Sequence, residues 1–191
     1  MIYLRNTREF SFENTAVTIG KFDGLHKGHR ALIERLLQCR GEGLKTVVMS
    51  LDFAPDAFDR QSAAEGDNDG TKNENRPLRG EAERMKILEE MGVDVFISYP
   101  FTGEDAAQEP IDFINSMIID KLGAKTVVVG NDFHFGRNRA GDAWLLQTYG
   151  SKHGYKTITL KRIEYEDEPI SSSRIRKALA EGRTEDAEKM M

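Results

Sequence analysis

The chain has 191 residues, which is enough for one domain with a real core and too few for two comfortable ones. Lysine and arginine number 27 against 32 acidic residues, and the net charge of -5 argues against a general nucleic-acid-binding surface. No run is long enough to cross a membrane, and a single cysteine, Cys39, excludes an internal disulfide. We therefore expect one cytoplasmic domain over residues 1–191 without a nucleic-acid or membrane partner, and no feature indicates its oligomeric state.

The motif GKFDGLHKGH, residues 20–29, lies between a strand predicted over residues 16–19 and a helix predicted over residues 30–39. Its two histidines, His26 and His29, are three residues apart and share one face where the helix begins. A helix N-terminus carries unpaired N–H groups and the positive end of the helix dipole, and both favour an anion. The motif therefore predicts a triphosphate-binding turn. The glycines that permit close approach of the backbone to the anion are Gly24 and Gly28.

Short β-rich runs alternate with longer amphipathic ones through the rest of the chain. This alternation predicts an α/β fold with an open, mainly parallel sheet and helices on both of its faces. The further predicted strands are residues 46–53, 93–98, 126–129 and 156–160. The further predicted helices are residues 81–91, 111–122, 143–150 and 173–180. Cys39 has no histidine nearby and is expected in the core.

One segment departs from this pattern. Residues 59–76 are almost devoid of large apolar side chains and rich in Asp, Asn, Glu and Gly, which predicts a mobile loop. Two interpretations stay open: a solvated connection without a role, or a lid over the site.

A second candidate site follows the strand at residues 126–129. Ligands of parallel α/β sheets bind beyond the carboxyl ends of the strands, where this loop falls. Phe133 and Phe135 beside Asp132 offer a stacking surface and a polar group to a flat ring. The alternative is that the two phenylalanines close the edge of the core while Asp132 caps a turn.

A third candidate site lies before the last predicted helix, where three serines, residues 171–173, precede two arginines. Serine is a good helix N-cap, so one interpretation is simply a capped helix. The other is a phosphate site, because hydroxyl, backbone N–H and guanidinium groups all bind phosphate oxygens. Arg174 and Arg176 are two residues apart and do not share a helix face, so only one is expected to meet the ligand.

Together, residues 20–29, 130–142 and 170–176 resemble the adenylyltransferase domain of bacterial bifunctional FAD synthetases. The order of the motifs matches, and residues 78–94 resemble the family's helix and Gly-Val-Asp turn. The resemblance implies a Rossmann-like nucleotidyltransferase fold and a reaction in which ATP and FMN, with Mg²⁺, give FAD and pyrophosphate.

Roles for individual residues follow from the same resemblance. The implied catalytic residues are His26, His29 and Arg176. The implied ATP-binding residues are Gly20, Phe22, Asp23, Gly24, Gly28, Ser172 and Ser173. The implied flavin-side residues are Phe53, Pro55, Asp132 and Phe135. No protein metal ligand is expected, because phosphate oxygens and water hold most of the Mg²⁺ coordination shell.

The chain departs from the family at the flavin side, where Phe-x-Pro-His-Pro is replaced by Phe53-Ala54-Pro55-Asp56-Ala57. This change keeps open a nucleotidyltransferase with a different phosphorylated acceptor. Two further alternatives are a nucleotide- or flavin-binding module without turnover, and a zinc site built on the histidine pair. The chain stops near the point where the family's riboflavin kinase domain begins, so no kinase activity is expected.

Overall fold

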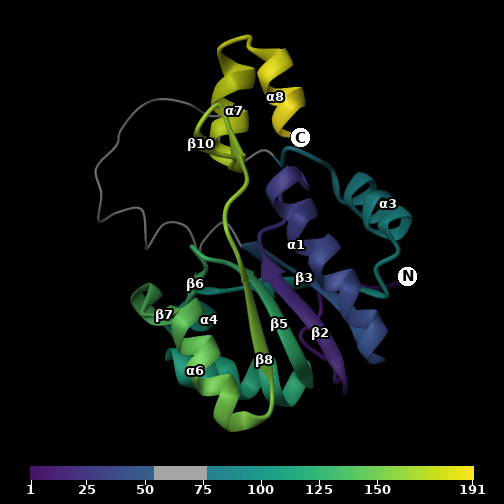
Figure 1. The fold of residues 1–191 in the computed structure, drawn as a ribbon, viewed down its shortest axis with the longest axis vertical. Coiled ribbons are helices and arrows are strands. Elements are labelled where there is room, and N and C mark those ends of the chain that lie inside the picture. Colours follow the sequence, from purple (N-terminus) through teal and green to yellow (C-terminus); the bar gives the residue numbers. More distant parts are fainter. Residues whose placement is uncertain (54–76) are drawn as a thin grey trace.

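Six parallel strands form one central sheet in the computed structural model, which describes residues 1–53 and 77–191 (Figure 1). The strand order is β1-β4-β3-β2-β5-β8, and every neighbouring pair runs parallel. The predicted α/β fold with a parallel sheet is therefore confirmed. The strands are β1 (Ile2–Leu4), β2 (Thr15–Gly20), β3 (Lys45–Phe53), β4 (Val95–Phe101), β5 (Ala124–Gly130) and β8 (Lys156–Leu160).

Helices cover both faces of the sheet (Figure 1). One face carries α1 (Lys27–Leu37), the short helix η1 (Gln38–Glu42) and α3 (Glu81–Met91). The opposite face carries α5 (Pro110–Phe113), η3 (Ile114–Lys121) and α6 (Ala143–His153). A further short helix, α4 (Gly103–Ala107), follows β4.

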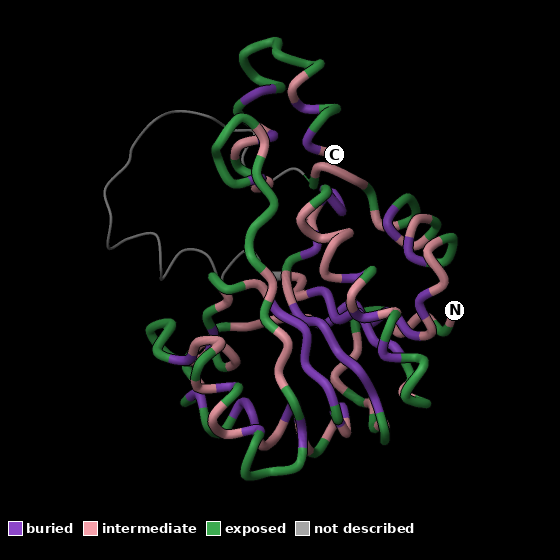
Figure 2. Tube along the Cα trace, in the orientation of Figure 1, coloured by how far each residue is buried: buried purple, intermediate pink, exposed green. Residues whose placement is uncertain are grey.

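The two cores follow from the alternation of side chains along the strands. In β3, Val47 and Met49 belong to the first core, together with Ile114 and Leu146. Val48 belongs to the second core, on the opposite face, together with Ile33. A period of two sends successive side chains to opposite faces, so both faces of the sheet are apolar and both are covered. Figure 2 shows the strands as the most continuously buried part of the chain. Cys39 is fully buried in the second core, as expected.

The last part of the chain lies beyond the carboxyl ends of the strands (Figure 1). Helices α7 (Ser172–Ala180) and α8 (Thr184–Met190) pack on each other around a small third core. That core is made of Ile170, Ile175, Ala178, Ala187 and Met190. The packing holds the start of α7 over the edge of the sheet at which α1 begins.

Several short elements were not predicted from the sequence. Strand β1 has only three residues, and the hairpins β6 (His134–Phe135)/β7 (Gly141–Asp142) and β9 (Glu164–Tyr165)/β10 (Glu168–Pro169) have two in each strand. Such lengths are too short to show a period. The 3₁₀ turn η4 (Arg137–Arg139) is equally short. The helix predicted over residues 111–122 is present. It consists of one turn of α-helix, α5, followed by the π-helix η3, and this change of helix type was not predicted.

Two predictions lie outside the described residues, namely the loop at residues 59–76 and the flavin-side Pro55. No helix in the described ranges has the length and apolar character needed to cross a bilayer.

Asp94 joins the amino ends of β3 and β4. Its carboxylate accepts hydrogen bonds from the backbone N–H of Thr46 at 2.8 Å and from the Thr46 hydroxyl at 2.7 Å. Arg40 donates to the same carboxylate at 2.6 and 3.2 Å. Burial by itself would raise the pKa of Asp94, but the hydrogen bonds from Arg40 and Thr46 outweigh it, and the pKa lies below its usual 3.8.

We expect Asp94→Asn to lower the free energy of unfolding by about 1–2 kcal/mol at neutral pH, because a charge-assisted network loses its charge. The folded-state pKa is depressed, so the ionised form stabilises the fold above the unfolded-state pKa, and this stability is lost as the pH falls. The gap between variant and wild type should therefore narrow below about pH 4. Urea denaturation at several pH values measures it, with the exposed Asp120→Asn as control. A gap that is the same at pH 3 and pH 7 would contradict the assignment.

Candidate active site

The two predicted histidines lie at the first turn of α1. His26 is the N-cap, and its Nδ1 accepts a hydrogen bond from the backbone N–H of His29 at 3.4 Å. The two rings stack with their centroids 3.7 Å apart, and the Phe22 ring lies 5.0 Å from that of His29. The pair is therefore held at a helix N-terminus, as the sequence predicted.

Both imidazoles are held in the neutral form. Burial lowers the pKa of His26 to about 4, with Asp23 opposing this shift and Arg162 adding to it. Burial lowers the pKa of His29 well below the ordinary 6.5, and the charge of His26 acts in the same direction. Because His26 Nδ1 accepts a hydrogen bond, the neutral ring carries its proton on Nε2, where it is free to be donated. His29 Nδ1 is buried and has no hydrogen-bond partner among the described residues.

The backbone between β2 and α1 is strained where it carries the motif. Phe22, Gly24 and Leu25 have φ angles of 42°, 76° and 46°, in the left-handed region. Phe22 and Leu25 are almost completely buried, so packing holds two side chains in a conformation that costs energy. A Cβ on Gly24 would lie 3.0 Å from Leu78, so steric space as well as φ requires glycine there.

A second glycine of the motif is required by the histidine itself. A Cβ on Gly28 would lie 3.2 Å from the His26 ring, closer than most real contacts allow. Gly28 therefore leaves room for the imidazole to cap α1. By contrast, a Cβ on Gly20, the last residue of β2, would meet only the Phe22 ring at 3.5 Å.

Asp23 brings the histidine motif and the serine-arginine segment together. Its carboxylate forms an ion pair with Arg176 of α7 and accepts a hydrogen bond from the backbone N–H of Leu78 at 2.8 Å. Its backbone carbonyl accepts a hydrogen bond from the Ser172 hydroxyl at 3.2 Å. Two segments that are far apart in the sequence thus form one surface beyond the carboxyl ends of the strands.

The two arginines of α7 face different surroundings. Arg174 donates to the backbone carbonyls of Tyr165 and Glu168 at 2.7 Å each, and pairs with the Glu168 carboxylate at 3.3 Å. Arg176 faces Asp23 and the histidine motif. Ser171 is the N-cap, accepting from the Arg174 N–H at 3.2 Å. Ser171 thus caps the helix, whereas the phosphate site was predicted at other residues of the same segment, Ser172, Ser173 and Arg176.

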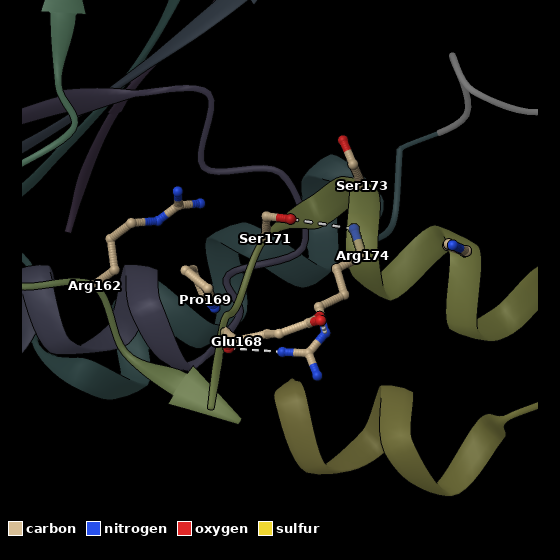
Figure 3. Close-up of a pocket in the computed structure, with 7 residues that line it drawn as sticks. Arg162, Glu168, Pro169, Ser171, Ser173 and Arg174 are labelled. Carbon is tan, nitrogen blue, oxygen red and sulfur yellow. Dashed lines mark hydrogen bonds and ion pairs between the residues drawn. The ribbon is translucent and has the colours of Figure 1, made fainter. Parts of the chain in front are cut away.

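Ser173 is exposed and lines an open pocket of about 410 Å³ beside the start of α7 (Figure 3). Figure 3 shows Arg162 on one side of this pocket and Ser171 and Ser173 on the other. The lining residues are Arg162, Glu168, Pro169, Ser171, Ser173, Arg174 and Lys177.

The loop after β5 divides into a core part and a surface part. Phe135 is only 8% exposed and packs between Phe113 and Phe133, with ring centroids 5.3 and 5.6 Å away. Its ring thus closes the edge of the core, and its flavin-side role stays a prediction. Asp132 is at the surface, where its carboxylate pairs with Arg162 at 3.4 Å.

Arg162 and a buried arginine, Arg84, were missed by the sequence reasoning. Arg84 is 9% exposed, donates to the Ser50 hydroxyl at 3.0 Å and lies 3.9 Å from the Asp52 carboxylate. The Ser50 hydroxyl donates in turn to the backbone carbonyl of Lys21 at 2.9 Å. This network lies near the carboxyl end of β3, which directly precedes the predicted flavin-side segment in the sequence. Phe53 is the last residue of β3.

Within residues 1–53 and 77–191, no three His, Cys, Asp or Glu side chains converge as metal ligands would. The zinc interpretation of His26 and His29 therefore lacks further ligands in this part of the chain.

A parallel α/β sheet with a histidine pair at one helix N-terminus, tied through a carboxylate to a second, serine-rich helix N-terminus, defines a nucleotidyltransferase. The FAD synthetase family model matches residues 9–174. The chain belongs to the FAD synthetase family, which confirms the resemblance and the predicted class of enzyme.

Three curated relatives are bifunctional riboflavin kinase/FMN adenylyltransferases. The protein of Escherichia coli (strain K12) is 32% identical over 188 residues, covering 98% of this chain and 57% of the relative. That of Listeria monocytogenes is 31% identical, covering 100% and 58%, and that of Buchnera aphidicola subsp. Schizaphis graminum is 30% identical, covering 93% and 54%. The chain thus spans between 54% and 58% of the length of these relatives.

A solved structure described as a macrolide-efflux protein from Streptococcus pneumoniae is similar in fold. Its TM-score is 0.81 at 27% identity, covering 100% of this chain and 60% of that one.

We expect His26 to titrate near pH 4 in the ligand-free protein, because burial opposes its charged form. Addition of pyrophosphate should raise this midpoint, because a neighbouring anion favours the imidazolium. NMR of the imidazole Cε1–H signals measures both, with His26→Gln to assign the resonance. A midpoint near 6.5 without ligand would show that the ring is solvated.

Proposed function

We propose that this chain is an FMN adenylyltransferase, which transfers AMP from ATP to FMN and releases pyrophosphate. The observation that carries the proposal is Asp23, because its ion pair with Arg176 and its hydrogen bond from Ser172 unite the two phosphate motifs. Neither motif alone can surround a triphosphate.

The proposed reaction is a displacement at the α-phosphorus of ATP. An oxygen of the FMN phosphate forms a bond to this phosphorus, and the bond between the α-phosphorus and the oxygen that bridges to the β-phosphorus breaks. The electron pair leaves with the pyrophosphate. Such transfers need no nucleophilic side chain, so the protein mainly aligns the two phosphates and stabilises their charge.

In this proposal His26 and His29 face the phosphate chain. The neutral His26 ring offers its Nε2–H as a donor, and His29 Nδ1 is a buried polar atom without a partner among the described residues. A phosphate beside these rings raises their pKa, so nucleotide binding is linked to proton uptake. Positive charge then appears only once the anion is bound, which avoids burying two unpaired imidazolium ions.

Ser172, Ser173 and Arg176 are the proposed ligands of the β- and γ-phosphates. Asp23 holds the Arg176 guanidinium on the side of α7 that faces the histidines. Because the ion pair already fixes the Arg176 side chain, the guanidinium loses little conformational entropy when it binds phosphate oxygens. Asp23 is therefore a positioning residue in this proposal.

Mg²⁺ enters the proposal as part of the nucleotide substrate. Both carboxylate oxygens of Asp23 already have partners, Leu78 N–H and Arg176. A donor set of this kind suits an ion held mainly by phosphate oxygens and water, where it neutralises the charge of the triphosphate. The proposal includes a cytoplasmic location and no nucleic-acid or membrane partner.

A different phosphorylated acceptor is the second candidate. The family's Phe-x-Pro-His-Pro segment is altered to Phe53-Ala54-Pro55-Asp56-Ala57. Phe53 and Pro55 are the flavin-side residues of the proposal, so the change falls where the acceptor would bind. A carboxylate in place of an imidazole alters the charge offered to the acceptor.

Incubation with ATP, Mg²⁺ and FMN is expected to yield FAD and pyrophosphate in equal amounts. Chromatography measures the FAD, and a pyrophosphate-release assay measures the second product. Turnover with another phosphorylated acceptor but not with FMN would favour the second candidate. Nucleotide binding without any product would instead make the chain a binding module.

His29→Ala should lower kcat/KM for adenylyl transfer by roughly 10²-fold or more, the scale of losing one preorganised transition-state donor. His153→Ala is the matched control, because His153 ends α6 at the amino edge of the sheet, where it stacks on Tyr149. Near-normal turnover of His29→Ala, or an equal loss in His153→Ala, would refute the mechanism.

A further inference from the structure

Arg162 lies where three segments of the site approach one another. It follows β8 by two residues, and β8 pairs with β5 in the sheet. The backbone N–H of Asn131 donates to the carbonyl of Leu160 at 2.9 Å, which keeps the ends of these strands together. Arg162 is thereby placed beside Asp132, at 3.4 Å between Nε and a carboxylate oxygen.

The same guanidinium reaches toward the phosphate motifs. Its positive charge lies close enough to His26 to lower the pKa of that ring. It also lines the pocket of about 410 Å³ that contains Ser173 (Figure 3). Arg162 therefore contacts the loop after β5 and lines the same pocket as Ser173, and its charge acts on His26.

The contact with Asp132 is weak. The Arg162 and Asp132 side chains are 39% and 53% exposed, and the Arg162 Nε lies 3.4 Å from the Asp132 carboxylate. Exposed pairs of this kind contribute about 0–1 kcal/mol. A phosphate offers the guanidinium two parallel hydrogen bonds and more charge, so it competes well with one exposed carboxylate.

We propose that Arg162 is a nucleotide-binding residue that leaves Asp132 when ATP enters and binds the triphosphate between His26 and Ser173. This inference rests on the proposed function. The contact with Asp132 keeps the guanidinium at the carboxyl edge of the sheet. In the complex the same side chain adds positive charge to the phosphates that become the leaving pyrophosphate, opposite Arg176.

Binding of inorganic pyrophosphate, measured by calorimetry, tests the proposal without an acceptor. Arg162→Gln should weaken this binding about 10-fold, because a charge-assisted contact is lost. Arg162→Lys should bind with intermediate affinity, since it keeps the charge but not the planar fork. Lys161 is an exposed neighbour of equal charge. The pyrophosphate affinity of Lys161→Gln should stay within about two-fold of wild type, because no charge-assisted contact to the phosphates is lost. An unchanged affinity in Arg162→Gln, or an equal loss in Lys161→Gln, would overturn the proposal.

Asp132→Asn separates direct binding from an effect that acts through Asp132. If Arg162 binds the phosphates itself, removing the competing carboxylate charge should leave pyrophosphate affinity equal or higher. If Arg162 only orients Asp132, Asp132→Asn should lose as much affinity as Arg162→Gln, and the inference is wrong.

Two further measurements locate the residue. In the ligand-free protein, Arg162→Gln should raise the His26 titration midpoint, because a nearby positive charge is gone, and Lys161→Gln should raise it less. In turnover, Arg162→Gln should raise KM for ATP and leave KM for FMN unchanged. A wild type that forms no FAD, combined with lost pyrophosphate affinity in Arg162→Gln, would reject the proposed function and retain this inference.

Discussion

The ion pair between Asp23 and Arg176 is the contact on which the site depends. The two side chains are only 16% and 25% exposed, so removing either one would leave the other a largely buried charge that has lost this ion pair. Asp23 belongs to the strained turn before α1, and Arg176 to a helix with its own small core. The position of α7 over the sheet is therefore fixed partly by electrostatics at the site itself, rather than by apolar packing alone.

The position of the histidine pair depends on the same turn before α1. The turn from Phe22 to Leu25 uses left-handed conformations that cost energy, and burial of both end residues offsets that cost. The turn delivers His26 to the N-cap, a position usually taken by a short polar side chain. An imidazole there accepts a hydrogen bond from one backbone N–H through Nδ1, and in the proposed function its Nε2–H is donated to a phosphate. Its neutrality follows from burial, which lowers the pKa of His26.

Periodicity predicted most of the fold, because the predicted elements are long enough to repeat. The predictions for Glu81–Met91 and Lys156–Leu160 match the observed bounds, and the family motifs marked the histidine and serine segments. Arg162 could not be predicted in this way. Its partner Asp132 precedes it by a whole helix and strand, and only the pairing of β5 with β8 brings them together. In the sequence, Arg84 looks like an ordinary charged residue on a surface helix. Only the fold shows that it contacts Ser50 and Asp52 of β3.

The Ser50 contact joins the end of β3 to the turn that carries the histidines. Ser50 lies near the end of β3, receives a hydrogen bond from buried Arg84 and donates one to the Lys21 carbonyl. Lys21 directly precedes the strained turn that carries Asp23 and the histidines. One hydrogen bond therefore ties the end of β3 to the residue that precedes the strained turn. If the proposed function holds, substitutions in the segment that follows β3 should alter nucleotide binding as well as acceptor choice, because this hydrogen bond ties the end of β3 to the turn.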